Sequence, residues 1–532
     1  MKSFWPTVLC LIIAINTAAQ QPPTSYAITN VKVVVTGGKV LEPATVVISD
    51  GLISAVGSKV AIPAEAMVID GKGLVVYPGL IDAFTDIGIQ DVSIDGAKQQ
   101  QFVQGPEQRP ATTPWLIAAT VFKSEDKRIE TWRQSGFTAI LSVPQKGIVA
   151  GQSSLINLSG EEAAKAVVKP KVALHLSFQS TGGFGTFPSS LMGIIAYVRQ
   201  LLLDSRRYSK VRAAYEVAPQ GLKRPEYDPA AAELAEILEA GLPVTLIASS
   251  ASEIRRIITL AQEFKIKPII VGAQQGYEVA NELAACKCPA IVNLKWPEKN
   301  PNADPEADEP LRILRLRAFA PSTPAALAKA GVKFAFYSGG LSPKEALKKV
   351  KKAIDAGLRP EDGINALTIW PAEIFGVASQ LGSIEVGKIA NLVVTDGELF
   401  DEKTKVKMVF VDGRKFEIRE AQKSKQPPEV DLSGKWTLTL NTPQGQQDVT
   451  LDLKMAPDGT LSGTISSHMG TIPIDEGQVS GTSFSIKANL SSGQRSLTIS
   501  FYGKVDNKEL KGTINFGDLT SEFTGRRPEV ER

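Results

Sequence analysis

Eight short apolar stretches, separated by segments with helical periodicity, constrain the fold of this chain most strongly. Each stretch has the length and the branched or aromatic content that is typical of a buried strand. The stretches are GLIDAF, FTAILSVP, SSLINL, VALHLSF, LPVTLIA, KPIIVG, PAIVNLKW and VKFAFYS. Eight strands that alternate with helices over roughly 300 residues predict an α/β fold, a (β/α)8 TIM barrel at residues 78–378. A doubly wound open sheet is the alternative, but no glycine-rich phosphate loop follows the first strand.

Two β-rich blocks flank the predicted barrel. Residues 26–76 and 382–418 lack helical periodicity, and Asp-Gly turn signals separate their short strands. Neither block is long enough to form a secure domain by itself. We therefore predict one composite β-sandwich domain that is built from residues 20–77 and 379–420.

The composition changes after a polar segment at residues 421–430, which we interpret as a linker. The chain beyond it is rich in Ser, Thr and Gly, and strands with an alternating pattern recur every 8 to 12 residues or so, roughly the spacing of small all-β domains. Helical signals are nearly absent there. Residues 431–532 are therefore predicted to form a C-terminal all-β domain, a small antiparallel barrel or a sandwich.

The first residues have the pattern of a secretory signal peptide. Lys2 precedes a short apolar run, and small residues end the segment at Ala19. Because the run is too short to span a bilayer, we predict that residues 1–19 are a cleaved signal peptide and that no transmembrane segment exists. The protein is then exported, to the periplasm or the extracellular space. A lipid anchor at Cys10 is the less favoured alternative.

Charge and cysteine content limit the partners and the sites. The formal net charge of +3 is too small to indicate nucleic acid or an anionic membrane as a partner. Cys286 and Cys288 remain after cleavage, and a bridge between them would close a very small ring. Two thiols without nearby histidines also make a weak metal site. We therefore expect two half-buried thiols where a helix meets a strand.

Two long motifs resemble a known family. They are IDGKGLVVYPGLIDAFTDIG at residues 69–88 and ALTIWPAEIFGVASQLGSIEVGKIANLVVTDGELF at residues 366–400. Both are similar to the amidohydrolase superfamily, and most similar to its imidazolonepropionase-like branch, over residues 26–418 of this chain. The resemblance implies a (β/α)8 barrel with a composite β-sandwich. It also implies a hydrolase that acts on amide, amidine or other non-peptide C–N bonds with one or two divalent metal ions, zinc or another.

The resemblance also implies where the metal ligands should stand. Family members take them, mostly as histidines, from strand ends at one face of the barrel. Two positions lie on the first strand, and one lies on each of the fifth, sixth and eighth strands. These five positions hold other residues here, namely Phe84, Asp86, Ile247, Val271 and Gly339.

The number of histidines limits the site further. The whole chain has two histidines, and because His468 lies in the predicted C-terminal domain, only His175 is available to the barrel. A histidine-rich metal site cannot be assembled, so we expect no metal cofactor. Asp86, as an oxygen ligand, and His175, as a base or a relic ligand, remain weak catalytic candidates. A hydrogen-bonded core histidine is the preferred interpretation of His175.

The residues at the ligand positions predict a pocket at the barrel mouth that is lined by both apolar and polar side chains. Its predicted lining is Phe84, Asp86, His175, Ile247, Val271, Gln274, Ser338 and Gly339, with Gln275 and Tyr337 beside them. Three functions stay open. The preferred one is a non-catalytic homologue that binds a small molecule. The others are an active hydrolase with an atypical site, and a structural partner of an active paralogue in a homo-oligomer or a hetero-oligomer.

Overall fold

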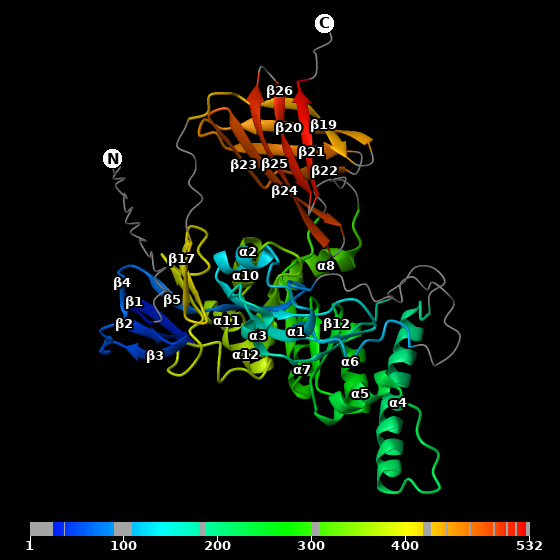
Figure 1. The fold of residues 1–532 in the computed structure, drawn as a ribbon. Helices are drawn as coiled ribbons and strands as arrows, with labels where there is room; N and C mark the ends of the chain where they lie inside the picture. The colour runs from blue at the N-terminus through cyan, green and yellow to red at the C-terminus, as the bar shows by residue number, and fades with distance from the viewer. Residues whose placement is uncertain are drawn as a thin grey trace, which may run out of the picture.

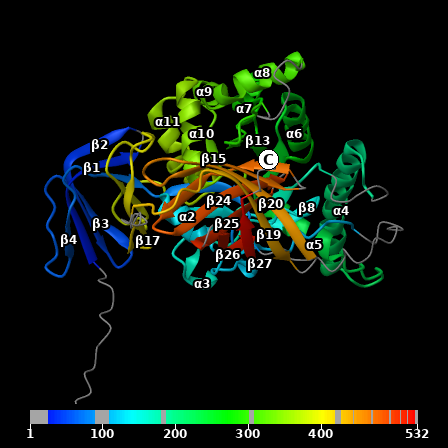
Figure 2. The same ribbon diagram turned by 90° about the horizontal axis from the view of Figure 1, so that it is seen from above.

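The computed structural model describes residues 25–36, 38–89, 109–179, 187–299, 308–418, 427–442, 445–467, 470–492, 495–506, 509–516 and 519–527. The predicted signal peptide, residues 421–426 of the predicted linker and His468 lie outside these segments. Figure 1 shows an N-terminal sheet beside a central part of strands and helices, with a C-terminal sheet above them. The view in Figure 2 places the C-terminal sheet over the central part.

The first sheet combines strands from the two β-rich blocks. Its order is β18-β17-β16-β5-β1-β2-β3, and β4 pairs with β1. The strands are β1 (Ser25–Thr36), β2 (Lys39–Ser49), β3 (Leu52–Gly57), β4 (Met67–Asp70), β5 (Val75–Pro78), β16 (Leu392–Thr395), β17 (Val406–Val411) and β18 (Arg414–Glu417). β16 joins the blocks by pairing antiparallel with β5, and the rings of Tyr26 and Phe410 pack edge to face at 5.4 Å between centroids. Residues from both blocks therefore pack in one core. Hydrogen bonds join the strands of both blocks into a single sheet.

The central part contains two further sheets. One has the order β10-β9-β7-β6, and the other has the order β15-β14-β13-β12-β11-β8. Their strands are β6 (Leu80–Thr85), β7 (Phe137–Ser142), β8 (Val149–Gln152), β9 (Ser154–Asn157), β10 (Val167–Lys169), β11 (Leu174–Leu176), β12 (Val244–Ala248), β13 (Pro268–Gly272), β14 (Ala290–Asn293) and β15 (Phe334–Tyr337).

The predicted barrel of eight parallel strands is not confirmed. β6 pairs parallel with β7, and β11 to β15 pair parallel in succession. However, β9 runs antiparallel to β7, and β8 runs antiparallel to β11. Residues 143–148 connect β7 to β8 without a helix, so the alternation of strands and helices that the barrel requires is interrupted here. The pattern of SSLINL predicts a strand, but it does not reveal the direction of that strand.

The two central sheets adjoin along both edges. At one edge, the backbone N–H of Ser153 donates to the carbonyl of Ala173 at 2.9 Å. At the other edge, residues 366–367 bridge the sheets, because the N–H of Ile81 donates to the carbonyl of Leu367 at 2.8 Å and the N–H of Phe336 donates to the carbonyl of Ala366 at 3.2 Å. One apolar core draws on both sheets, with Ala139 from one and Ile291 from the other fully buried in it. The two sheets are thus packed as one body, and the ends of β6, β11 and β15 can meet.

Helices surround the central sheets. They are α1 (Ala118–Val121), α2 (Arg128–Gln134), α3 (Ala163–Ala166), α4 (Leu191–Val217), α5 (Pro229–Glu239), α6 (Ala251–Phe264), α7 (Gly276–Cys286), α8 (Leu311–Phe319), η2 (Ala320–Ser322), α9 (Thr323–Lys329), α10 (Pro343–Asp355), α11 (Pro360–Asn365) and α12 (Ile369–Ile374). In α6, a capping box of Ser250 and Glu253 satisfies the first turn, and Ile254 and Ile257 lie on its buried face. Within the described segments, no helix has the length and apolarity that a membrane crossing requires.

The C-terminal region is an all-antiparallel sheet, as the alternating pattern predicts. Its order is β22-β21-β20-β19-β27-β26-β25-β24-β23. The strands are β19 (Gly434–Thr442), β20 (Gly445–Met455), β21 (Leu461–Ser467), β22 (Gly470–Pro473), β23 (Glu476–Ser480), β24 (Ser483–Ser492), β25 (Arg495–Asp506), β26 (Glu509–Phe516) and β27 (Leu519–Arg526). The N–H of Val479 donates to the carbonyl of Gly459 at 2.8 Å, so the sheet curls and its ends approach each other. Trp436, Phe501 and Phe523 are buried in its own core.

The expectation of two free thiols is wrong. Cys286 and Cys288 form a disulfide, and their Cα atoms are 5.2 Å apart. α7 ends at Cys286, and Lys287 takes a left-handed conformation with φ of 56°. This turn brings the two Cα atoms within the range that a disulfide spans. The bridge therefore follows from the end of the helix, which the residue spacing alone does not show.

Candidate functional site

Three aromatic rings from three strands meet in the central part, and we call Phe84, His175 and Tyr337 the aromatic cluster. They belong to β6, β11 and β15. The ring of Phe84 packs edge to face against both others, with centroids 5.6 Å from His175 and 5.4 Å from Tyr337. Phe84 is only 8% exposed. The position where the resemblance implies a metal-binding histidine is therefore the centre of a packed aromatic group.

Two aliphatic side chains extend this apolar surface. Ile247 on β12 and Val271 on β13 are partners in the parallel ladder. Both belong to the same hydrophobic core as Phe84, Val271 as a buried residue and Ile247 as a half-buried one. The sequence places Phe84, Ile247 and Val271 together, and the structure brings them together. They present hydrocarbon where the resemblance implies metal ligands.

His175 is a buried and neutral imidazole. Its Nδ1 lies 2.5 Å from the hydroxyl oxygen of Thr245, which itself lies 3.4 Å from the carbonyl of Leu174. Burial lowers the pKa of His175 to about 3, because a low-dielectric environment disfavours the charged ring. Among the described residues, its Nε2 has no hydrogen-bond partner. The fold thus satisfies one ring nitrogen and buries the other without a partner among the described residues.

Asp86 does not join the aromatic cluster, contrary to the expected pocket lining. Its side chain is 55% exposed and forms an ion pair with Arg128 at 2.6 Å. Arg128 also pairs with Asp126 at 2.7 Å. β6 ends at Thr85, so the strand alternation that would aim residues 84 and 86 to one side no longer holds. Asp86 thus belongs to a surface ion-pair group with Asp126 and with Arg128 of α2.

Gln274 and Gln275, predicted near the pocket, are engaged with backbone groups. The Nε2 of Gln274 donates to the carbonyl of Lys295 at 2.9 Å. The Oε1 of Gln275 accepts from the N–H of Ala251 at 2.9 Å, close to the start of α6. These contacts fix the loop that follows β13, and they use polar atoms that a pocket ligand would otherwise reach.

Ser338 and Gly339 follow β15 directly. Gly339 has φ of +63°, a conformation that favours glycine. A Cβ atom at this position would lie 2.1 Å from the Oδ1 of Asn293. An aspartate, which the resemblance implies here, therefore fits neither the backbone nor the space. No motif marks Asn293 as a site residue, although it interrupts the apolar run PAIVNLKW.

Asp82 is a buried carboxylate behind the aromatic cluster. Its oxygens accept from the indole N–H of Trp132 at 3.0 Å and from the backbone N–H of Ser338 at 3.2 Å. Burial raises the pKa of Asp82 above its ordinary value, although these hydrogen bonds oppose the shift. The carboxylate joins β6, α2 and the end of β15. This arrangement gives Asp82 a structural role, in which the indole N–H of Trp132 is its partner from α2.

The side chains present do not fit the divalent metal site that the resemblance implies. Within the described segments, no three His, Cys, Asp or Glu side chains form a group that could hold a metal ion. The Nδ1 of His175 faces Thr245, and Asp86 faces Arg128. A divalent ion that loses water needs about three protein donors in return. A metal-dependent step has no support from these residues.

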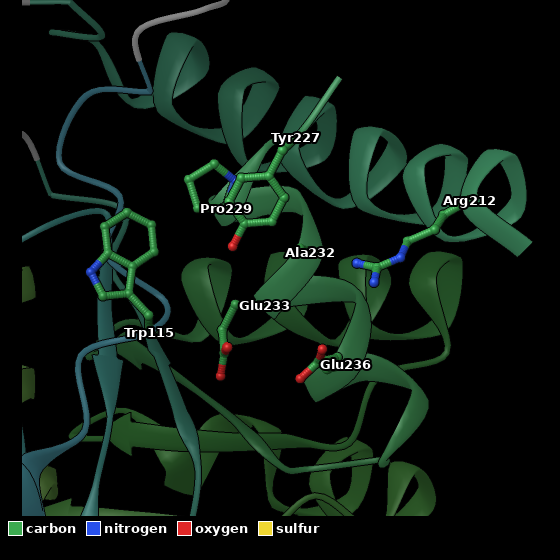
Figure 3. Close-up of a pocket in the computed structure, with 7 residues that line it drawn as sticks. All are labelled: Trp115, Arg212, Tyr227, Pro229, Ala232, Glu233 and Glu236. Carbon is green, nitrogen blue, oxygen red and sulfur yellow. The ribbon is translucent and has the colours of Figure 1, made fainter. Parts of the chain in front are cut away.

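A depression of about 330 Å³ lies elsewhere on the molecule. Figure 3 shows its lining, which comes from α4, α5 and the segments before them: Trp115, Arg212, Tyr227, Pro229, Ala232, Glu233 and Glu236. No residue of the predicted pocket is among them. No periodic pattern or motif marks this depression in the sequence, because its residues come from separate segments.

Comparisons with known proteins agree with the resemblance. Residues 229–417 match the model of the amidohydrolase family. Among solved structures, an amidohydrolase from Thermotoga maritima MSB8 is 26% identical, with a TM-score of 0.61 over 74% of this chain and 100% of that chain. A Xaa-Pro dipeptidase with methionine bound in its active site is 18% identical, with a TM-score of 0.46 over 74% of this chain and 100% of that chain. Curated protein sequences give no significant match.

The chain thus contains an amidohydrolase family domain, and its structural neighbours belong to the amidohydrolase superfamily. This domain covers α5 to β18 and includes Ile247, Val271 and Gly339, three of the five positions at which the resemblance implies ligands. The residues at these three positions differ from the ligands that the resemblance implies.

Proposed function

We propose that this protein is a non-catalytic homologue of the amidohydrolases, from their imidazolonepropionase-like branch, that binds a small molecule at the aromatic cluster. The packing of Phe84 between His175 and Tyr337 carries this proposal. The ring occupies the position of the first metal-binding histidine, and it contacts side chains from two other strands. A single conservative substitution of Phe84 would not restore a metal ligand at this packed position.

The energetics of a divalent ion support the loss of the metal site. A divalent ion held against Phe84, Val271 and Ile247 would give up water without gaining donors from those side chains. Burial of an uncompensated charge in such surroundings is strongly unfavourable. The same apolar and aromatic surfaces suit an uncharged organic molecule, because most small-ligand sites are largely apolar with a few polar groups that fix orientation.

The chemistry of His175 limits the ligand. With a pKa of about 3, the imidazole is neutral at physiological pH and does not pair with an anion. Its Nε2 accepts a hydrogen bond when Nδ1 carries the proton and donates one when Nε2 carries it. A small, uncharged molecule with an apolar ring and an amide group suits this place, since the amide offers both a donor and an acceptor.

Benzamide, titrated into the purified protein, tests both parts of the proposal. We expect benzamide to bind, and its affinity to fall by about fivefold in His175→Gln, the loss of one hydrogen bond of roughly 1 kcal/mol. Trp115→Leu, which removes an aromatic ring outside the cluster, is the control and should leave the affinity unchanged. We also expect no benzoate to form, with or without added zinc. Zinc-dependent release of benzoate, or an unchanged affinity in His175→Gln, would contradict the proposal.

We also propose that the protein is exported after cleavage of residues 1–19. The charged start, the short apolar run and the small residues up to Ala19 support this proposal. Sequencing the N-terminus of the protein from its native location should show Gln20 as the first residue. A lipid-modified Cys10 would replace this proposal with membrane anchoring.

A further inference from the structure

The depression between α4 and α5 has the size of a small-ligand site. Its volume is about 330 Å³, at the lower end of the range of roughly 300 to 1,000 Å³ for such sites. In Figure 3, the ring of Tyr227 and the indole of Trp115 border it on one side, and the carboxylates of Glu233 and Glu236 project below them. The guanidinium of Arg212 approaches from α4.

Two large aromatic side chains line this depression and are open to solvent. Trp115 is 47% exposed and Tyr227 is 71% exposed. Exposed aromatic surface that gathers around a hollow indicates a binding site more often than scattered apolar residues do. The faces of both ring types carry negative potential and attract cations, indole most strongly. The aromatic part of the lining therefore favours a positively charged ligand.

Two carboxylates add to this preference. Glu233 and Glu236 are three positions apart on α5, so they lie on one face of the helix, where like charges repel each other. The Oε1 of Glu233 accepts from the Nε2 of Gln152 at 2.8 Å and lies 3.4 Å from the Nζ of Lys171. Glu236 is exposed and forms no ion pair with the described residues. A cation at Glu236 would relieve the repulsion within α5.

Gln152 holds Glu233 in place from the protein interior. The residue is fully buried, and its Nε2 also donates to the carbonyl of Pro114, which precedes Trp115. Its Oε1 is buried and has no hydrogen-bond partner among the described residues. A buried acceptor without a donor is unusual in native structures. The N–H that Gln152 donates fixes the Glu233 carboxylate and partly offsets its charge, so Glu236 is the carboxylate that stays open to a ligand.

The positive groups nearby are already engaged. The Nε of Arg212 lies 2.9 Å from the Oε1 of Glu216, one turn further along α4. The N-terminus of α5 is capped by Asp228, whose Oδ1 accepts from the N–H of Ala231 at 2.9 Å. Neither group therefore presents an uncompensated positive charge to the depression.

We propose that this depression binds a small organic cation, an alkylammonium or quaternary ammonium compound, with its charge against Glu236 and the rings of Trp115 and Tyr227. This site shares no residue with the aromatic cluster, and it goes beyond the function proposed above. An inorganic cation would gain little here, because two carboxylates on one helical face supply too few oxygen ligands for Ca²⁺ or Mg²⁺.

Calorimetric titration of the full chain with choline tests the proposal, and 3,3-dimethyl-1-butanol serves as the uncharged analogue of the same shape. We expect choline to bind and the uncharged analogue to bind at least about fivefold more weakly, since an exposed cation–π contact contributes roughly 1 kcal/mol. Trp115→Leu and Glu236→Gln should each weaken choline binding by a similar factor. Glu239→Gln removes a charge from the same helix outside the depression, and it should leave choline binding unchanged.

Three results would overturn the proposal. One is equal binding of choline and its uncharged analogue, which would mean that the site reads shape and not charge. Another is choline binding that Glu236→Gln and Trp115→Leu both leave unchanged, which would place choline elsewhere. The last is no choline binding at all by a protein whose melting curve shows that it is folded.

Discussion

The aromatic cluster and the depression between α4 and α5 both contain aromatic rings, but they differ in what surrounds those rings. At the cluster, Phe84 is buried and packs against a neutral imidazole. At the depression, Trp115 is half exposed, and carboxylates flank it. The first arrangement excludes charge, while the second attracts positive charge.

This difference teaches that the strand ends at which the resemblance implies metal ligands need not be where this chain keeps its exposed charged groups. At the strand ends, apolar side chains fill the positions of the ligands. On the flank, the two carboxylates lie on α5 and Arg212 lies on α4, outside the two motifs that carry the resemblance. The two regions should therefore respond differently to truncation, acid, charge removal and metal.

Truncation of an aromatic ring should separate the two regions most clearly. Phe84→Ala leaves a cavity among His175, Tyr337 and their neighbours, so we expect the free energy of unfolding to fall by about 3–5 kcal/mol. Trp115→Ala removes a half-exposed ring and should lower it by about 1 kcal/mol or less. Urea unfolding of both variants provides the measurement. Equal losses would show that the cluster is no better packed than the surface.

Acid should weaken the protein through His175. Burial holds its pKa at about 3 in the folded chain, whereas an unfolded histidine titrates near about 6.5. Between these values only the unfolded chain takes up the proton. The free energy of unfolding should therefore fall by about 1.4 kcal/mol per pH unit as the pH drops below about 6.5.

His175→Gln should remove this contribution, so the difference in stability between the two proteins should change with pH. His468 is present in both and cancels in the comparison. Unfolding curves near neutral pH and in mild acid provide the measurement. Parallel pH profiles would mean that His175 takes up its proton in the folded protein at an ordinary pH.

Removal of charge at the depression should have a small effect of the opposite sign. Glu236→Gln relieves the repulsion from Glu233 on the same face of α5, so we expect it to raise the free energy of unfolding by about 0.2–0.5 kcal/mol. The stabilisation should shrink in high salt, because salt screens exposed charges. A destabilised variant would indicate that Glu236 has a cationic partner in the folded chain.

We expect the smallest effect, on zinc binding, from a variant that partly rebuilds the metal site. Phe84→His with Asp86→His supplies two imidazoles, but residue 86 faces Arg128 on the surface. Ile247 and Val271 still offer no donors. We therefore expect zinc titration to find no tight site in this variant.

A fuller reconstruction is also limited by the fold. Adding Ile247→His, Val271→His and Gly339→Asp would place an aspartate against Asn293, where a Cβ atom has no room. We expect this set to bind zinc only when Asn293 is also shortened. Tight zinc binding by the double variant would contradict the assignment of Asp86 to the surface.

Sequence patterns predicted the parts of the fold that depend on local chemistry. Alternation of apolar and polar residues identified the C-terminal antiparallel sheet, and the retained motifs around Phe84 located the aromatic cluster. β8 was not predicted, and the direction of β9 was missed because a strand looks the same in both directions. The disulfide was missed because it depends on the left-handed turn at Lys287.

The candidate site was predicted in part. Phe84, Ile247 and Val271 share one apolar core, as their positions on parallel strands indicate. Asp86 was misplaced because the strand ends one residue earlier, at Thr85. The depression was not predicted, because Trp115 and Tyr227 are far apart in the sequence and only the packing of α4 and α5 unites them.

Elemental analysis of the unmutated protein, expressed with added zinc and then dialysed against a weak chelator, tests the central claim most directly. If Phe84 and its neighbours have replaced the metal site, the protein should retain far less than one zinc, iron or manganese ion per chain, and it should remain folded. About one tightly held metal ion per chain, lost from Phe84→Leu or His175→Gln, would show that the aromatic cluster is a metal site and that the protein retains the means for hydrolysis.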